Sequence, residues 1–137
     1  RTIAADDFYL GLFETDIKSD EILIGINYPL LKNDEKILFE EVCRRHGDYA
    51  MAGLIAKVKT YQSTIEKLKL VFFATGDRPN VTSKTSEIVV NNGYEYSVIK
   101  KSLSSEIDFA GDLNSSEEMK LHLATILISK ILKKLEN

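Results

Sequence analysis

The chain has 137 residues, of which 44% are hydrophobic and 28% charged, so it can bury one hydrophobic core. Its net charge of −3 disfavours general binding to nucleic-acid phosphates. The apolar runs are far shorter than the ~18 to 20 residues of a membrane helix, and a single cysteine, Cys43, excludes an internal disulfide. We therefore expect one domain over residues 1–137, located in a reducing cytoplasm.

The first residues predict little regular structure. The chain begins at Arg1 without the basic and then apolar order of a signal peptide, and we expect this start to be a cut within a longer chain. Asp6 and Asp7 are adjacent, so their carboxylates point apart in an extended segment. Alternatively, they begin a short helical turn whose buried side is Phe8 and Tyr9.

Four segments show the patterns of β-strands. Residues 21–27 alternate, with three isoleucines on one face, and Tyr28-Pro29 ends the run. In residues 36–43, Ile37 and Phe39 face one way and Leu38, Glu40 and Val42 the other, and the charges indicate one exposed face. Alanine and methionine in residues 49–58 favour a helix, but Gly53 weakens it, and we predict a strand. Residues 61–64 predict a hairpin turn into the strongly apolar strand 65–74.

Helical signals follow the strands. Thr82 or Ser83 can cap a short helix that ends near Asn92, where Gly93 supplies the stop, and a second helix is predicted over residues 94–103. Ser115-x-x-Glu118 has the pattern of a capping box before a broadly apolar helix that runs to the end of the chain. The order of elements predicts an α+β fold, in which an antiparallel sheet of three to four strands packs on about three helices as a two-layer sandwich.

The most unusual local sequence lies between two predicted strands and reads Arg44-Arg45-His46-Gly47-Asp48-Tyr49. Two guanidiniums, an imidazole and a carboxylate beside a glycine could surround an anionic or aromatic ligand, with Tyr49 available for stacking. The alternative is a solvated turn whose arginines pair with Glu40 or Glu41. The residues alone leave both interpretations open.

The other candidate residues do not form a catalytic or metal site. Cys43 is predicted at the end of a strand, where its side chain need not point toward His46, and a third orienting group is not identifiable. His122 is interpreted as a partly exposed helix residue. The turn at residues 76–79 lacks the glycine and lysine pattern of a phosphate loop. We expect no catalytic residue, no metal ligand and no activity of the isolated domain.

Three segments carry a resemblance to a known family. The first is Arg1-Thr2-Ile3-Ala4-Ala5-Asp6-Asp7-Phe8-Tyr9-x-Gly11, followed by Thr15 and then Asp20-Glu21-Ile22-Leu23-x-x-Ile26-x-x-Pro29. The second is Phe39-x-x-Val42-x-Arg44-Arg45-x-Gly47-Asp48-Tyr49-Ala50, and the third is Asp108 with Ser115-Ser116-x-Glu118-x-Lys120-x-His122-Leu123-Ala124. Together they resemble the C-terminal domain of carbon monoxide dehydrogenase-type flavoproteins, the FAD-carrying medium subunits of molybdenum hydroxylases, which also occur fused into xanthine dehydrogenases. Where the family commonly has a Tyr-Arg pair, this sequence has Met119-Lys120. The arginine expected shortly after Pro79 is not evident.

The resemblance implies a function for the unusual loop. It implies that an upstream module, absent from this chain, holds most of the FAD, and that the loop approaches the flavin from the C-terminal side. The candidate flavin-side residues are Arg44, Arg45, Gly47, Asp48, Tyr49 and Ala50. The implied partners are that FAD-binding module, a small subunit with iron–sulfur clusters and a large subunit with molybdopterin, without nucleic acid or membrane. The alternative hypothesis is a stand-alone interaction or dimerisation module with no flavin role.

Overall fold

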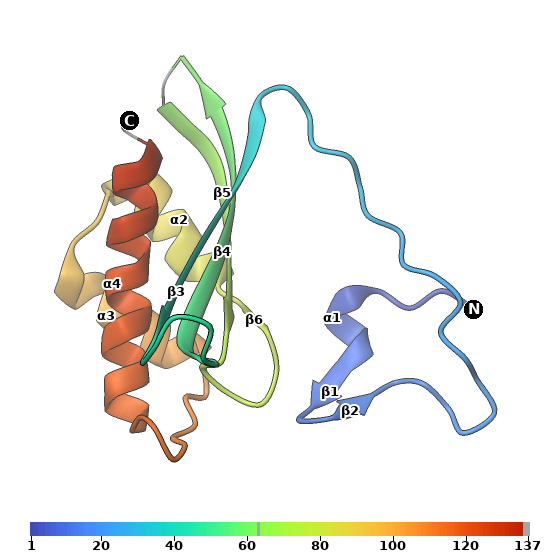
Figure 1. Ribbon diagram of the computed structural model, residues 1–137. Helices are drawn as coiled ribbons and strands as arrows, with labels where there is room; N and C mark the ends of the chain where they lie inside the picture. The colour runs from blue at the N-terminus through green and yellow to red at the C-terminus, as the bar shows by residue number, and fades with distance from the viewer. Residues whose placement is uncertain (63, 136–137) are drawn as a thin grey trace.

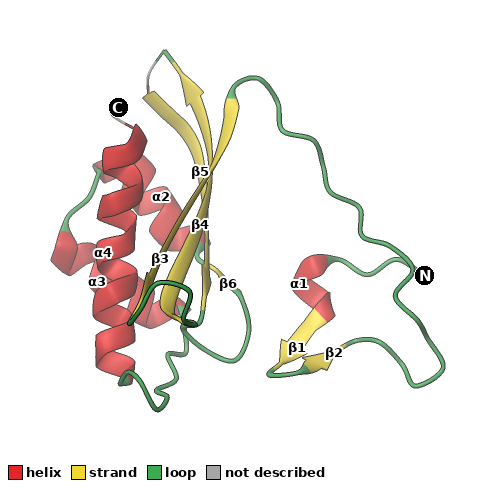
Figure 2. Ribbon diagram, in the orientation of Figure 1, coloured by secondary structure: helices red, strands yellow, loops and turns green. Residues whose placement is uncertain are grey.

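The fold has two layers, a four-stranded antiparallel sheet and three helices that cover one of its faces (Figure 1 and Figure 2). A computed structural model describes residues 1–62 and 64–135. The strand order is β3-β4-β5-β6. The elements of the two layers are β3 (Glu35–Cys43), β4 (Ala50–Tyr61), β5 (Thr64–Phe73), β6 (Asn80–Val81), α2 (Ser83–Asn92), α3 (Tyr96–Glu106) and α4 (Glu117–Leu135). This arrangement confirms the predicted α+β sandwich.

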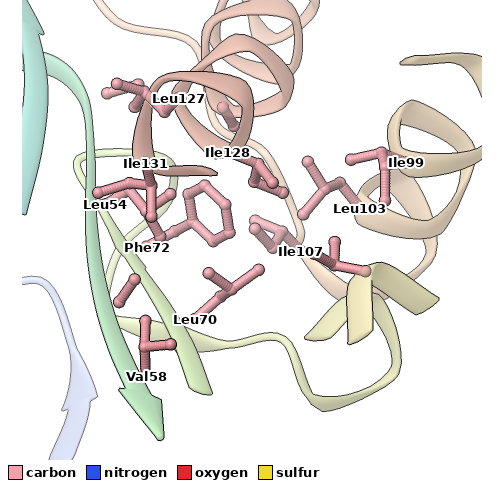
Figure 3. Packing of buried hydrophobic residues seen from close by; sticks show 14 residues of the cluster. Leu54, Val58, Leu70, Phe72, Ile99, Leu103, Ile107, Leu127, Ile128 and Ile131 are labelled. Carbon is pink, nitrogen blue, oxygen red and sulfur yellow. The ribbon is translucent and has the colours of Figure 1, made fainter. Parts of the chain in front are cut away.

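Alternating side chains along the two central strands build the core. Leu54, Ala56 and Val58 of β4 are fully buried on the helical side, together with Leu70 and Phe72 of β5. Figure 3 shows the side chains that meet them, which are Ile99, Leu103, Leu127, Ile128 and Ile131 of the helices and Ile107 directly after α3. Burying one large apolar side chain contributes about 1.5 to 3 kcal/mol, so this contact between sheet and helices is the main stabilising feature of the fold.

The strands predicted over residues 36–43, 49–58 and 65–74 are confirmed as β3, β4 and β5. The prediction that residues 49–58 form a strand rather than a helix is correct because this segment is the centre of the sheet, paired on both sides. The predicted hairpin turn joins Tyr61 to Thr64, and its residue Ser63 lies outside the described residues.

The start of α2 is capped by a residue from another helix. Thr82 occupies the N-cap position, as predicted, but its side chain makes no capping hydrogen bond. The carboxylate of Glu106 instead accepts hydrogen bonds from the backbone N–H of Lys84 and of Thr85, each at 2.8 Å. Gly93 ends the helix with a φ of 76°, a conformation that glycine adopts without steric cost.

The next helix begins two residues later than predicted. Glu95 caps α3 with its carboxylate, which accepts from the backbone N–H of Ser97 at 3.1 Å and of Val98 at 2.7 Å. The helix then continues to Glu106, beyond the predicted end at residue 103. The sequence signal for this start is Glu95, an acidic N-cap residue that the prediction placed inside the helix.

The capping box predicted for α4 is wrong by one residue. The hydroxyl of Ser116 accepts from the backbone N–H of Met119 at 3.2 Å, so Ser116 provides the cap. Ser115 is held by the preceding turn, because its backbone N–H donates to the carboxylate of Asp112 at 3.0 Å. Among the described residues, no helix is both long and apolar enough to cross a membrane.

Residues 1–34, which we call the arm, leave the sheet at β3 and run apart from it (Figure 1). The arm contains α1 (Ala5–Phe8), β1 (Tyr9–Gly11) and β2 (Glu14–Thr15), and the two strands pair with each other. The short helical turn proposed for Asp6 and Asp7 is confirmed as α1, although only Phe8 is half-buried and Tyr9 is exposed.

The strand predicted over residues 21–27 is wrong. The segment is irregular and its isoleucines are exposed, because no neighbouring strand of the described chain pairs with it. The fourth strand of the sheet is instead the two-residue strand β6, which pairs with β5. The arm is closed on itself by Arg1, whose guanidinium lies 2.7 Å from the carboxylate of Glu21 and 2.6 Å from that of Asp16.

Candidate functional site

The loop between β3 and β4 is a compact exposed turn at one end of the sheet. The backbone N–H of Asp48 donates to the carbonyl of Arg45 at 3.0 Å, which closes the turn. Gly47 has a φ of 84°, in the left-handed region that favours glycine. The carboxylate of Asp48 accepts from the backbone N–H of Tyr49 at 3.1 Å. The backbone of this predicted site is therefore defined by its own short-range hydrogen bonds.

The side chains of the loop face solvent. Arg44, Arg45, Asp48 and Tyr49 are all exposed, and Tyr49 reaches 93% exposure. The sixth candidate residue, Ala50, is half-buried at the start of β4. The structure thus brings the six predicted residues together on the turn and at the start of β4, and it leaves the ring of Tyr49 and the guanidinium of Arg45 open to a ligand or partner.

The alternative of arginines paired with nearby carboxylates does not hold for Glu40. Glu40 points to the helical side of the sheet and pairs with Lys134 of α4. Within residues 1–62 and 64–135, no ion pair joins Arg44 or Arg45 to a carboxylate. The guanidinium of Arg44 instead donates to the side-chain oxygen of Asn114 at 2.9 Å, which connects the loop to the segment before α4.

The segment before α4 is held in place by a buried lysine, Lys120. The ammonium of Lys120, whose side chain is 6% exposed, lies 2.8 Å from the carboxylate of Asp112 and donates to the carbonyl of Ala74 at 2.8 Å. Asp112 also accepts from the backbone N–H of Asn114 at 2.7 Å. The Lys120 ammonium and this N–H hold the pKa of Asp112 at about 2. The charge pair therefore orders the residue that contacts Arg44.

The residues that follow β5 also contact the segment before α4. Ala74 has a φ of 58°, and the carbonyl of Thr75 accepts from the backbone N–H of Ala110 at 3.0 Å. At Gly76 an added Cβ would lie 2.9 Å from the carbonyl oxygen of Asp108, so the two backbones approach closely there. Three connections, after β3, after β5 and before α4, are consequently joined at one end of the sheet.

Sequence reasoning missed Asp112, Asn114 and Lys120. A usable signal was present, because Lys120 stands four residues before Ala124 and eight before Ile128, on the buried stripe of α4. A lysine on such a stripe requires a counter-charge nearby. The partner is eight residues away across an irregular segment, so the pairing itself could not be read from helical spacing.

The remaining candidates have ordinary structural surroundings. Cys43 is half-buried at the end of β3, and His46 is exposed in the loop. The Nδ1 atom of His122 lies 2.8 Å from the hydroxyl of Tyr96, which links α4 to α3. No group of three or more histidine, cysteine, aspartate or glutamate side chains that could hold a metal ion occurs in the described part of the chain.

Comparison with families of known proteins gives a match over most of the chain. The family model described as the CO dehydrogenase flavoprotein C-terminal domain matches residues 37–135. The glyceraldehyde dehydrogenase medium chain of Sulfolobus acidocaldarius is 28% identical over 136 residues, which cover 97% of this chain and 48% of the relative. The nicotine 6-hydroxylase medium subunit of Paenarthrobacter nicotinovorans is 26% identical over 135 residues, covering 95% of this chain and 46% of the relative.

Solved structures share the fold. The CO dehydrogenase of Oligotropha carboxidovorans superposes with a TM-score of 0.86 at 18% identity, covering 99% of this chain and 49% of that one. The quinoline 2-oxidoreductase of Pseudomonas putida gives a TM-score of 0.84 at 22% identity, covering 99% of this chain and 48% of that one. The chain therefore spans about half the length of the proteins that it resembles.

Proposed function

This chain belongs to the family of CO dehydrogenase flavoprotein C-terminal domains, and we propose that it borders the flavin in the FAD subunit of a molybdenum hydroxylase. The loop residues that would face the flavin are Arg44, Arg45, Gly47, Asp48, Tyr49 and Ala50. The observation that carries the proposal is that the guanidiniums of Arg44 and Arg45 form no ion pair with a carboxylate of the described chain.

The residues present fit one side of a flavin and not a complete FAD site. The exposed ring of Tyr49 offers an apolar face for a planar heterocycle, and the Arg45 guanidinium offers five N–H donors to an anion. No glycine-rich pyrophosphate loop accompanies them in this sequence. We therefore propose that most of the FAD is held by a module outside this chain. When bound, FAD accepts electrons and passes them on.

The role of the loop is electrostatic and positional. A fixed cation beside an isoalloxazine stabilises its reduced, anionic form and raises its reduction potential. The contact between Arg44 and Asn114 would hold the backbone of the loop, while Arg45, which makes no such contact, remains available to the ligand. Electrons would reach this flavin from iron–sulfur clusters in a small subunit, after substrate hydroxylation at molybdopterin in a large subunit.

The test compares substitutions in the intact flavin-containing subunit. Arg45→Ala should lower the flavin reduction potential and weaken FAD binding by about three- to tenfold, roughly 0.7 to 1.4 kcal/mol, whereas Arg45→Lys should retain most of the potential because it keeps the charge. Asp48→Ala should alter the same quantities by loosening the turn. Lys101→Ala, on an exposed helix surface, is the matched control. Unchanged potential and affinity in both loop variants would reject the site.

One observation favours a second candidate function, a stand-alone interaction or dimerisation module. Apolar side chains are exposed on the face of the sheet that the helices do not cover, among them Ile37 and Phe39. Mass measurement of the isolated chain separates the two functions, since a stable dimer that does not affect FAD binding by the upstream module would favour this candidate.

A further inference from the structure

The guanidinium of Arg44 is held by a neutral partner. Its Nη1 atom donates to the Oδ1 atom of Asn114 at 2.9 Å. No carboxylate of the described chain forms an ion pair with Arg44 or with Arg45. A carboxylate would accept two N–H donors of a guanidinium and cancel its charge. An amide oxygen instead fixes the position of the guanidinium and leaves its positive charge uncompensated.

The backbone that carries Asn114 is a closed turn. The carboxylate of Asp112 accepts from the backbone N–H of Asn114 at 2.7 Å and from that of Ser115 at 3.0 Å. The backbone N–H of Asp112 in turn donates to the carbonyl of Ser115 at 2.9 Å. The side chain of Asn114 leaves this turn toward the loop between β3 and β4, where it meets Arg44. The position of its amide oxygen is therefore defined by the turn and not by the loop.

The charges that support the turn balance each other. The ammonium of Lys120 lies 2.8 Å from the carboxylate of Asp112 and is almost fully buried. The hydrogen bond from Lys120 lowers the pKa of Asp112 to about 2, so the carboxylate is ionised at pH 7 and balances the ammonium. The pair thus orders the turn without adding net charge to the loop that the turn supports.

The loop itself is cationic on a chain whose net charge is −3. Its two guanidiniums, on Arg44 and Arg45, stand against the single carboxylate of Asp48. That carboxylate accepts a hydrogen bond from the backbone N–H of Tyr49 at 3.1 Å and pairs with neither arginine in the described chain. An anionic group that approaches this turn therefore meets a local excess of positive charge.

We propose that Asn114 is a positioning residue that tunes the flavin, because it fixes Arg44 beside the loop and leaves the charge of Arg44 to act on the reduced, anionic isoalloxazine. The inference rests on the proposed function and adds to it a residue from outside the loop. Arg45 is the residue open to direct contact, whereas Arg44 acts through the field of a fixed charge. A charge that is already in position needs no reorganisation when the flavin gains electrons. Residue 114 therefore helps to set how strongly the loop favours reduced over oxidised flavin.

An isosteric substitution separates the charge from the contact. Asn114→Asp keeps an oxygen acceptor for Arg44 but adds a negative charge, so it should strengthen the contact and cancel the charge of Arg44. In the intact flavin-containing subunit, the affinity for reduced FAD relative to oxidised FAD should fall about three- to tenfold. A fall of this size lowers the reduction potential of a two-electron couple by ~15 to 30 mV.

Amide hydrogen exchange of residues 44–50 in the same subunit reports the order of the loop separately from the flavin potential. Asn114→Asp should keep or increase the protection of these amides. Asn114→Leu, which has a similar volume but no acceptor, should lower their protection about threefold or more. The control is Asn91→Asp, which adds the same charge on the exposed surface of α2. Asn91 lies near Lys67 and Leu68 at the hairpin end of β5, away from the loop, so the control should change neither quantity.

The combined results separate flavin tuning from structural support. An unchanged affinity ratio in Asn114→Asp, with loop protection retained, would overturn the proposal and leave Asn114 as a support of the loop. A ratio that falls equally in Asn91→Asp would also overturn it, because the effect would then follow net charge alone. A fall accompanied by loss of loop protection would assign the effect to disorder of the loop and overturn the proposal too.

The Arg45→Ala variant distinguishes failure of this inference from failure of the proposed function. If Arg45→Ala changes the affinity ratio and Asn114→Asp does not, the loop borders the flavin and the tuning by Asn114 is rejected. If neither variant changes the ratio, the flavin role of the loop and the tuning by Asn114 are both rejected. If Asn114→Asp alone lowers the ratio, Arg44 is the acting cation and the proposal is supported.

Discussion

Removing one charge of the buried pair between Lys120 and Asp112 should have an asymmetric effect on stability. The side chain of Lys120 is 6% exposed and that of Asp112 is 42% exposed. Asp112→Asn leaves a buried ammonium without its counter-charge, which costs about 3 to 5 kcal/mol. Lys120→Met leaves a carboxylate that water can reach, and the main loss is the hydrogen bond to the carbonyl of Ala74, about 1 to 3 kcal/mol.

The assay is urea unfolding of the isolated chain, followed by circular dichroism at pH 7. With a slope of roughly 1.5 kcal/mol per molar urea, Asp112→Asn should lower the midpoint by about 2 M or more and Lys120→Met by about 1 M. The double variant should resemble Lys120→Met, since no buried charge is then left unpaired. Lys101→Met, an exposed control, should change the free energy of unfolding by less than about 0.5 kcal/mol. Equal losses in the single variants that add in the double variant would refute this reasoning.

Two further predictions concern the cap of α2 and the closure of the arm. Glu106→Ala removes the carboxylate that caps α2 and should lower the free energy of unfolding by about 1 to 2 kcal/mol in the same urea assay. Glu87→Ala, at an exposed position of α2, is the control. Equal unfolding midpoints for the two variants would contradict a capping role for Glu106. The hydrogen bond to Arg1 lowers the pKa of Glu21 to about 2, so closure of the arm is stabilised above the ordinary glutamate pKa of 4.5 and lost as pH falls toward 2. The protection of the arm's amides, which is the intrinsic exchange rate at each pH divided by the observed rate, should fall over that interval, and protection that stays constant would exclude the ion pair between Arg1 and Glu21 as the contact that closes the arm.

The candidate site could be predicted only as a segment. The charged loop with Gly47 and Tyr49 stands out in the sequence, and the structure places it on one exposed turn. Its support by Asn114 and Lys120 could not be predicted, because those contacts join residues 70 and 46 positions apart in the chain. Local patterns report turns and caps, whereas contacts between distant loops depend on how the elements pack.

The sequence by itself determined the elements whose signals are local. The alternation around Leu54 and Phe72 required two buried strands, and Gly93 ended α2, because side-chain direction and backbone freedom follow from neighbouring residues. Only the tertiary structure decided that residues 21–27 remain outside the sheet and that Glu106 caps a helix begun 23 residues earlier. An alternating segment becomes a strand only where another strand is in place to accept its hydrogen bonds, and pairing over such distances is a property of the whole fold.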